Sequence, residues 1–312
     1  MRLAYVDGGT RVAASTALAL VLSSCVVLTT LPRAVVQRAD GALAVQSIPC
    51  NVDRDSPEPN DIDRRQTLDP AAIRAFTWNI HKQGDAGWER DLARFVAASD
   101  LVLLQEAVLS PPLLTVLESE HLRFTMASAF LYKDIDVGVL TAARVLPFAR
   151  CTELVVEPWL RIPKAATVTW YALEGSSQTL VVANIHAVNF ALSLDEYREQ
   201  FAALLAVLRK HDGPMILGGD FNTWTDGRLA VVLETAAALH LTAIPFVDDR
   251  RTLFFGHQLD HLLVRGLDVV QADVIAVESS DHNPVMATLR CVACHSGSAA
   301  LSSENEANAH GE

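Results

Sequence analysis

Short apolar runs, several of them followed by a polar side chain capable of chemistry, recur through the middle of this 312-residue chain. Runs of this length bounded by turn residues are typical of buried strands. They occupy Ile73–Trp78, Leu101–Leu104, Val137–Leu140, Ala165–Leu173, Leu180–Ile185, Met215–Leu217 and His261–Val264. Helical segments separate them at irregular intervals, which predicts a mixed α/β fold.

One helix between these strands is clearly marked. Ser193 and Glu196 have the spacing of a capping box, and an apolar stripe at helical periodicity follows them. Gly213 and Pro214 then stop the pattern. The sequence predicts a helix from Ser193 to His211.

Residues whose polar side chains can bind a metal ion or transfer a proton occur at six places, each at the end of an apolar run or just before such a run. An isolated acid at a strand end is usually a turn residue or a helix cap, but six coincidences argue against that explanation for the whole set. Strand ends present side chains into a crevice, so we expect one shared site. The residues are Asn79, Gln105, Glu106, His186, Asp220, Asn222, Asp260, Asp281 and His282.

The residue types in this set select a class of reaction. Carboxylate and amide oxygens without a cysteine cluster favour a hard cation, Mg²⁺ or Mn²⁺, over zinc. The sequence has no Gly-rich phosphate loop and no G-x-S-x-G elbow, so nucleotide-driven transfer and serine hydrolysis lack support. What remains is attack of water on phosphorus, with a metal ion and histidines stabilising the developing charge.

Five strings resemble the endonuclease/exonuclease/phosphatase superfamily and, within it, the YafD-type bacterial proteins. They are TWNIHKQ, LVLLQEA, NIHAVNF, GDFNTW and SDHNP, in this order between Ile73 and Leu289. That superfamily includes DNase I-like nucleases, abasic-site endonucleases, neutral sphingomyelinases and inositol polyphosphate phosphatases. The resemblance implies a DNase I-like fold, a four-layer α-β-β-α sandwich of two mixed β-sheets flanked by helices. Such a fold does not select the substrate.

The resemblance also implies a metal site. Glu106 would be the principal carboxylate ligand of Mg²⁺ (or Mn²⁺), with Asn79 beside it. Asp281 would assist the same ion or a second one.

Five further residues receive catalytic roles from the resemblance. Asp220 would orient or deprotonate the attacking water, and Asn222 would help hold the phosphate. His282 would stabilise the transition state, and Asp260 would hydrogen-bond His282 and fix its tautomer. His186 would be the general acid at the leaving oxygen.

The sequence predicts a phosphoester hydrolase that acts as a phosphodiesterase, nuclease or phosphatase. Its substrate would be a nucleic acid, a phospholipid or a small phosphate ester, and no protein partner is evident. Residues 71–290 hold 18 Lys and Arg against 26 Asp and Glu, which disfavours a long polyanion as substrate. The alternative is a non-catalytic binding module that retains the fold, although no catalytic acid or histidine is missing.

The N-terminal region has a different character. From Val12 to Pro32 the chain carries no charge, and Arg2 and Arg11 precede this run. Such a run indicates a signal peptide or a membrane helix. Leu22-Ser23-Ser24-Cys25 resembles a bacterial lipobox, so cleavage, lipidation at Cys25, an uncleaved anchor and an internal helix packed on the domain stay open. The first three place the protein outside the cytoplasm, membrane-anchored or secreted, in the bacterial periplasm or at the cell surface, and this is the localisation we expect.

These observations divide the chain into four parts. We expect a signal peptide, lipoprotein signal or membrane anchor over residues 1–38, an acidic flexible linker over 39–70, the catalytic domain over 71–290 and a disordered tail over 291–312. At the start of the tail, Cys291, Cys294 and His295 match the C-x-x-C-H pattern of c-type haem attachment. A local disulfide and free thiols are the alternatives.

Overall fold

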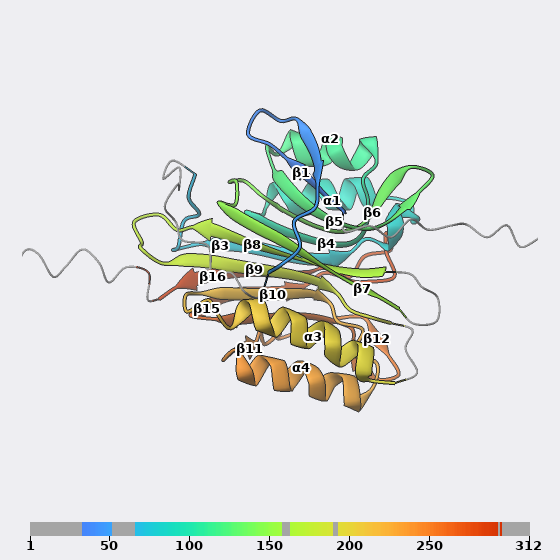
Figure 1. The fold of residues 1–312 in the computed structure, drawn as a ribbon, viewed down its shortest axis with the longest axis vertical. Coiled ribbons are helices and arrows are strands. Elements are labelled where there is room, and N and C mark those ends of the chain that lie inside the picture. The colour runs from blue at the N-terminus through green and yellow to red at the C-terminus, as the bar shows by residue number, and fades with distance from the viewer. Residues whose placement is uncertain (1–32, 52–65, 158–162, 190–192, 293, 295–312) are drawn as a thin grey trace, which may run out of the picture.

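A computed structural model describes residues 33–51, 66–157, 163–189, 193–292 and 294. Two β-sheets lie face to face, and a pair of helices covers the outer face of each (Figure 1). Both sheets are mixed, because β3 pairs with β4 and β9 pairs with β10 in parallel while the other pairs are antiparallel. The predicted four-layer α-β-β-α sandwich is therefore confirmed.

The larger sheet has eight strands. In spatial order they are β15 (Leu267–Val274), β16 (Val285–Cys291), β3 (Ile73–Asn79), β4 (Leu101–Val108), β6 (Ile135–Ala143), β5 (Arg123–Tyr132), β1 (Arg33–Gln37) and β2 (Leu43–Gln46). The helices α1 (Trp88–Ala97) and α2 (Pro111–Ser119) pack on its outer face, and the short η1 (His81–Gln83) follows β3.

The smaller sheet has six strands. Their order is β11 (Thr242–Ala243), β14 (Asp260–Arg265), β10 (Met215–Asp220), β9 (Thr179–His186), β8 (Pro163–Ala172) and β7 (Ala149–Val156). The helices α3 (Asp195–Leu208) and α4 (Asp226–Ala238) cover it, and a separate hairpin pairs β12 (Leu253–Phe254) with β13 (His257–Gln258).

Four apolar clusters fill the spaces between the four layers. Two lie between the two sheets, and one lies beneath each helix pair. The two clusters between the sheets explain why the strands of both sheets appear as continuous apolar runs, since β8 and β9 are buried on both faces.

The predicted helix at Ser193–His211 is α3, which is shorter at both ends. Ser193 lies outside the helix, where its hydroxyl donates to the Glu196 carboxylate at 3.0 Å. Asp195 N also donates to Ser193 Oγ at 3.2 Å, so the predicted pair closes a turn just before the helix.

The folded region begins earlier than residue 71, which differs from the predicted linker. Residues 33–37 and 43–46 form β1 and β2 at the edge of the larger sheet. Arg33 Nε contacts Asp136 Oδ1 at 2.7 Å, and a disulfide joins Cys50 to Cys151. Both partners lie about a hundred residues along the chain, so the local composition of the segment gives no sign of them.

The remaining N- and C-terminal predictions fall largely outside the described residues. The uncharged run Val12–Pro32, Cys25, residues 52–65 of the predicted linker and His295 are among those not described. Of the helices in the described ranges, none is long and apolar enough to cross a membrane. Cys291 and Cys294 form a disulfide, one of the three alternatives for that motif.

Candidate active site

Strand register gathers three of the predicted residues at one end of the smaller sheet. Parallel pairing of β9 with β10 places His186 opposite Asp220, and antiparallel pairing of β10 with β14 places Asp220 opposite Asp260. Directly paired residues have their side chains on the same face, about 5 Å apart. Gly219, with φ of +142°, makes this close pairing possible, because a Cβ there would lie 2.0 Å from Ile185 O.

The larger sheet supplies the facing half of the site. Parallel pairing of β3 with β4 aligns Asn79 with Gln105, and Gln105 Nε2 donates to Asn184 Oδ1 of the other sheet at 2.6 Å. The ladder between β4 and β6 is irregular after Leu104, where Glu106 adopts a φ of +52°. Such an irregularity re-aims a side chain, and the carboxylate of Glu106 lines the pocket while Gln105 stays buried between the sheets.

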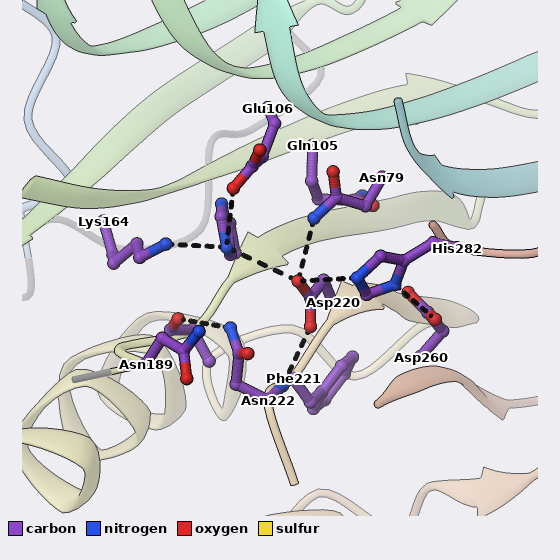
Figure 2. A network of polar contacts seen from close by, with 12 residues as sticks. Asn79, Gln105, Glu106, Lys164, Asn189, Asp220, Phe221, Asn222, Asp260 and His282 are labelled. Atoms are coloured by element: carbon purple, nitrogen blue, oxygen red, sulfur yellow. Dashed lines mark hydrogen bonds and ion pairs between the residues drawn. The ribbon is translucent and has the colours of Figure 1, made fainter. Parts of the chain in front are cut away.

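The predicted residues surround one pocket of about 300 Å³. Asn79, Glu106, His186, Asp220, Asn222, Asp281 and His282 all line it, and Asp260 lies behind His282. Figure 2 shows Asn79, Asn222 and His282 around Asp220, with Asp260 behind His282.

Asp220 is the centre of this arrangement. Its Oδ2 accepts from Asn79 Nδ2 at 3.0 Å, which links the two sheets, and its Oδ1 accepts from Asn222 N at 3.0 Å (Figure 2). Asn222 has a φ of +50° and donates its side-chain amide to Ala187 O, which fixes the turn after β10. Burial raises the pKa of Asp220 to about 6, against the lowering effect of the nearby charge of His282.

His282 and Asp260 form the hydrogen-bonded pair that the family resemblance implies. His282 Nδ1 lies 2.8 Å from Asp260 Oδ2, and its Nε2 lies 3.9 Å from Asp220 Oδ2. Trp78 Nε1 donates to the backbone oxygen of His282 at 2.8 Å and fixes this segment. Burial disfavours the charged ring, but the carboxylates of Asp260 and Asp220 outweigh it and raise the pKa of His282 to about 10.

His186 has the opposite electrostatic setting. The pKa of His186 is well below its ordinary value, because burial disfavours the charged ring and, to a smaller extent, because the positive charges of Lys164 and His282 repel it. Its Nε2 lies 2.8 Å from Lys164 Nζ, whose own pKa is lowered by burial. His186 is therefore a neutral imidazole in this arrangement, with Asp220 Oδ2 at 3.4 Å.

The pocket offers oxygen donors suited to a hard divalent cation. Glu106 and Asp281 present carboxylates to it, and Asn79 contributes an amide. The ammonium of Lys82 pairs with Glu106, so a cation already balances this carboxylate. Asp220, Asp260 and His282 also have ligand atoms within 4.8 Å of one another, but the hydrogen bond between Asp260 and His282 engages two of them. The donor set at Glu106 fits Mg²⁺ or Mn²⁺ better, because it contains oxygen alone.

Several residues of the site were missing from the sequence prediction. Lys82, Asn189 and Trp224 line the pocket and lie within the strings that carry the family resemblance, so their positions offered a signal. Lys164 offered none, because a lysine beside an apolar run is usually an exposed strand end. His261, which follows Asp260, packs beside the site: its ring contacts Phe221 and its Nε2 lies 2.7 Å from Thr223 Oγ1.

Comparison with known proteins gives matches over most of this domain. The model of the endonuclease/exonuclease/phosphatase family matches residues 76–282. A UPF0294 protein of Vibrio cholerae is 38% identical over 219 residues, covering 70% of this chain and 78% of the relative. A UPF0294 protein of Klebsiella pneumoniae is 39% identical over 214 residues, covering 69% of this chain and 80% of that relative.

Solved structures share the fold at low sequence identity. The human Nocturnin catalytic domain with bound sulfate superposes with a TM-score of 0.54 at 19% identity, covering 72% of this chain and 95% of that domain. Humanized TDP2 of D. rerio superposes with a TM-score of 0.54 at 18% identity, covering 70% of this chain and 99% of that chain. ANGEL2, a 2′,3′-cyclic phosphatase in complex with adenosine-2′,3′-vanadate, superposes with a TM-score of 0.52 at 13% identity. The match covers 70% of this chain and 95% of that chain.

Proposed function

Because the chain belongs to the endonuclease/exonuclease/phosphatase family, a family of phosphoesterase-type hydrolases, we propose that it is a divalent-metal-dependent phosphoesterase that uses water as its nucleophile. One observation carries the proposal: the buried carboxylate of Asp220 lies between the His282–Asp260 pair and Asn79, in a pocket that also holds Glu106. A carboxylate with a raised pKa beside a protonated histidine is the pairing that acid–base chemistry requires.

The metal would bind at Glu106 as the principal ligand, with Asn79 and Asp281 assisting. When bound, Mg²⁺ or Mn²⁺ supplies charge stabilisation at a phosphoryl oxygen.

Asp220 is the proposed acceptor of the proton of the attacking water. With a pKa of about 6 it is largely ionised at pH 7 yet basic enough to accept a proton. The hydrogen bonds from Asn79 and Asn222 fix the orientation of its carboxylate before substrate arrives.

His282 is the proposed stabiliser of the negative charge on the phosphoryl oxygens. Its raised pKa keeps the ring protonated at neutral pH. Asp260 accepts from Nδ1, so the Nε2–H points towards the pocket and Asp220.

His186 keeps its proposed place at the leaving oxygen. Because the ring is neutral and its Nε2 lies 2.8 Å from Lys164 Nζ, we propose that the Lys164–His186 pair, rather than a charged imidazole, donates the hydrogen bond to the leaving oxygen. The contact with Lys164 Nζ holds it in position.

We also propose that the protein acts outside the cytoplasm, attached to a membrane through residues 12–32. The disulfides Cys50–Cys151 and Cys291–Cys294 support an oxidising compartment, where such bonds persist.

The test uses the purified full-length protein on DNA, RNA, sphingomyelin, phosphoinositides and bis(p-nitrophenyl) phosphate. We expect turnover of at least one ester and a loss of roughly 10²- to 10⁴-fold in Asp220→Asn. Asp268→Asn, at an exposed position on β15, is the matched control and should be unchanged. A folded wild-type protein that binds inorganic phosphate but hydrolyses none of the esters would favour the non-catalytic binding module.

A further inference from the structure

A second pocket opens beside the active site. This side pocket has a volume of about 150 Å³, and most of its exposed wall is apolar, although Glu157 and Lys164 also line it. It shares Lys82, Glu106, His186 and Asn189 with the active-site pocket, so the two are continuous. The apolar walls include Phe130, Val137, Val139, Pro163 and Ala165. Substrate bound at the metal and histidine residues would therefore have apolar surface directly beside its reacting group.

Exposed apolar side chains lie on two sides of the combined opening. Tyr132, two residues after Phe130 of the side pocket, is 51% exposed, and Val156, paired with Pro163, is 46% exposed. Across the active-site pocket, the hairpin of β12 and β13 exposes Leu253, Phe254 and Phe255, and Phe254 itself lines that pocket. We call Tyr132, Val156, Leu253, Phe254 and Phe255 the apolar rim. Exposed apolar surface gathered around a site marks an interaction surface.

The chain enters the domain next to the side pocket. Arg33 is the first residue of β1 and forms an ion pair with Asp136. Val137, the residue that follows Asp136, lines the side pocket. In the sequence, the uncharged run Val12–Pro32 ends directly before Arg33. A membrane anchor in that run would hold this end of the larger sheet, and the opening with it, at the bilayer surface.

Most of the positive charges around the opening are paired or buried, and Lys133 beside Tyr132 is an exposed exception. Lys82 pairs with Glu106, and Lys164 is buried against His186. Beside the hairpin, Arg250 and Arg251 each pair with an aspartate, Asp248 and Asp249, at 2.5 and 2.6 Å. A phosphate backbone needs cations that are free to neutralise it, whereas an apolar rim favours the interface of a bilayer.

From these observations we propose that the substrate is a phosphodiester lipid of the bilayer in which the protein is anchored, an inference that rests on the proposed function. The phosphodiester occupies the active-site pocket, the apolar rim contacts the bilayer, and the alcohol side of the phosphodiester, with the start of the lipid's apolar part, lies in the side pocket. Because His186, proposed for the leaving oxygen, borders the side pocket, the lipid alcohol is the leaving group.

The reaction balances as a hydrolysis. The oxygen of water forms a bond to phosphorus, and the bond between phosphorus and the oxygen of the lipid alcohol breaks. One proton of the water ends on that alcohol oxygen, and the other passes to Asp220 and then to solvent. The products are a diacylglycerol-type alcohol and the phosphorylated headgroup.

The test reconstitutes the full-length protein with Mg²⁺ in vesicles of phosphatidylcholine and phosphatidylglycerol. Mass spectrometry should detect diacylglycerol together with phosphocholine or glycerol phosphate. The double variant Tyr132→Ser/Val156→Ser should lower lipid turnover by about tenfold or more, since each substitution removes apolar contact with the bilayer. Turnover of soluble bis(p-nitrophenyl) phosphate by this variant should equal that of the wild type.

Leu233→Ser is the matched control, because Leu233 is 57% exposed on α4 in the outer helix layer and should affect neither reaction (Figure 1). Hydrolysis of the soluble ester without hydrolysis of lipid would overturn the inference and leave the proposed function standing. Faster hydrolysis of an oligonucleotide than of lipid would also overturn it, as would a double variant no different from Leu233→Ser. Failure on every ester would instead reject the proposed function.

Discussion

The pairing of His282 with Asp260 can be tested by a double-mutant cycle. The Nδ1 to Oδ2 distance is 2.8 Å, and both side chains are buried, so the hydrogen bond is charge-assisted and shielded from water. Such a bond contributes about 1.5–3 kcal/mol, which corresponds to roughly 10- to 150-fold in rate if Asp260 acts solely through His282. Asp260→Asn should lower kcat by that factor.

His282→Ala should lower kcat further, by about 10³-fold, because it removes the charged group that we propose stabilises the phosphoryl oxygens. The two residues act as a unit, so the double variant should be scarcely slower than His282→Ala. The assay is kcat on whichever ester the wild type hydrolyses best, with circular dichroism to show that each variant folds. Additive losses in the double variant would refute the reasoning, as would near-normal turnover by His282→Ala.

Three further predictions concern stability. Burial lowers the pKa of His261 to about 4, so below about pH 6.5 the unfolded chain binds a proton more readily than the folded one. The free energy of unfolding should therefore fall by about 3 kcal/mol between pH 7 and pH 4. Urea titrations of His261→Gln should show a smaller fall over the same range. Replacing Cys50 and Cys151 by serine should lower the free energy of unfolding by about 2–5 kcal/mol, and an unchanged denaturation midpoint would count against a structural disulfide. Gly219→Ala should prevent accumulation of folded protein, because its Cβ would clash with backbone, and a soluble variant of normal melting temperature would contradict this packing.

Much of the site could be predicted because its residues sit at strand ends. Once β9, β10 and β14 pair in register, His186, Asp220 and Asp260 must lie side by side, and the apolar runs that fix this register are visible in the sequence. The layers follow from the same runs, since strands buried on both faces require cover on both sides.

Contacts between distant segments could not be predicted in this way. β1 pairs with β5 about ninety residues later in the chain. Its short sequence RAVVQ directly follows the longer apolar run, so the sequence does not show that a separate strand begins there. Lys164 and His186 meet because antiparallel β8 and β9 bring their ends together, yet nothing near Lys164 in the chain indicates a buried partner. The electrostatic state of His186 depends on that contact and so required the structure.

Metal dependence of hydrolysis tests the central claim most directly. The measurement is turnover of a phosphoester by metal-stripped protein, titrated with Mg²⁺, for the wild type and for Glu106→Gln. We expect no turnover in excess chelator, full recovery of the wild type with Mg²⁺ and, since Glu106 is the proposed principal metal ligand, little recovery of Glu106→Gln at the same concentrations. Full wild-type turnover in chelator, or equal recovery of Glu106→Gln, would contradict the account.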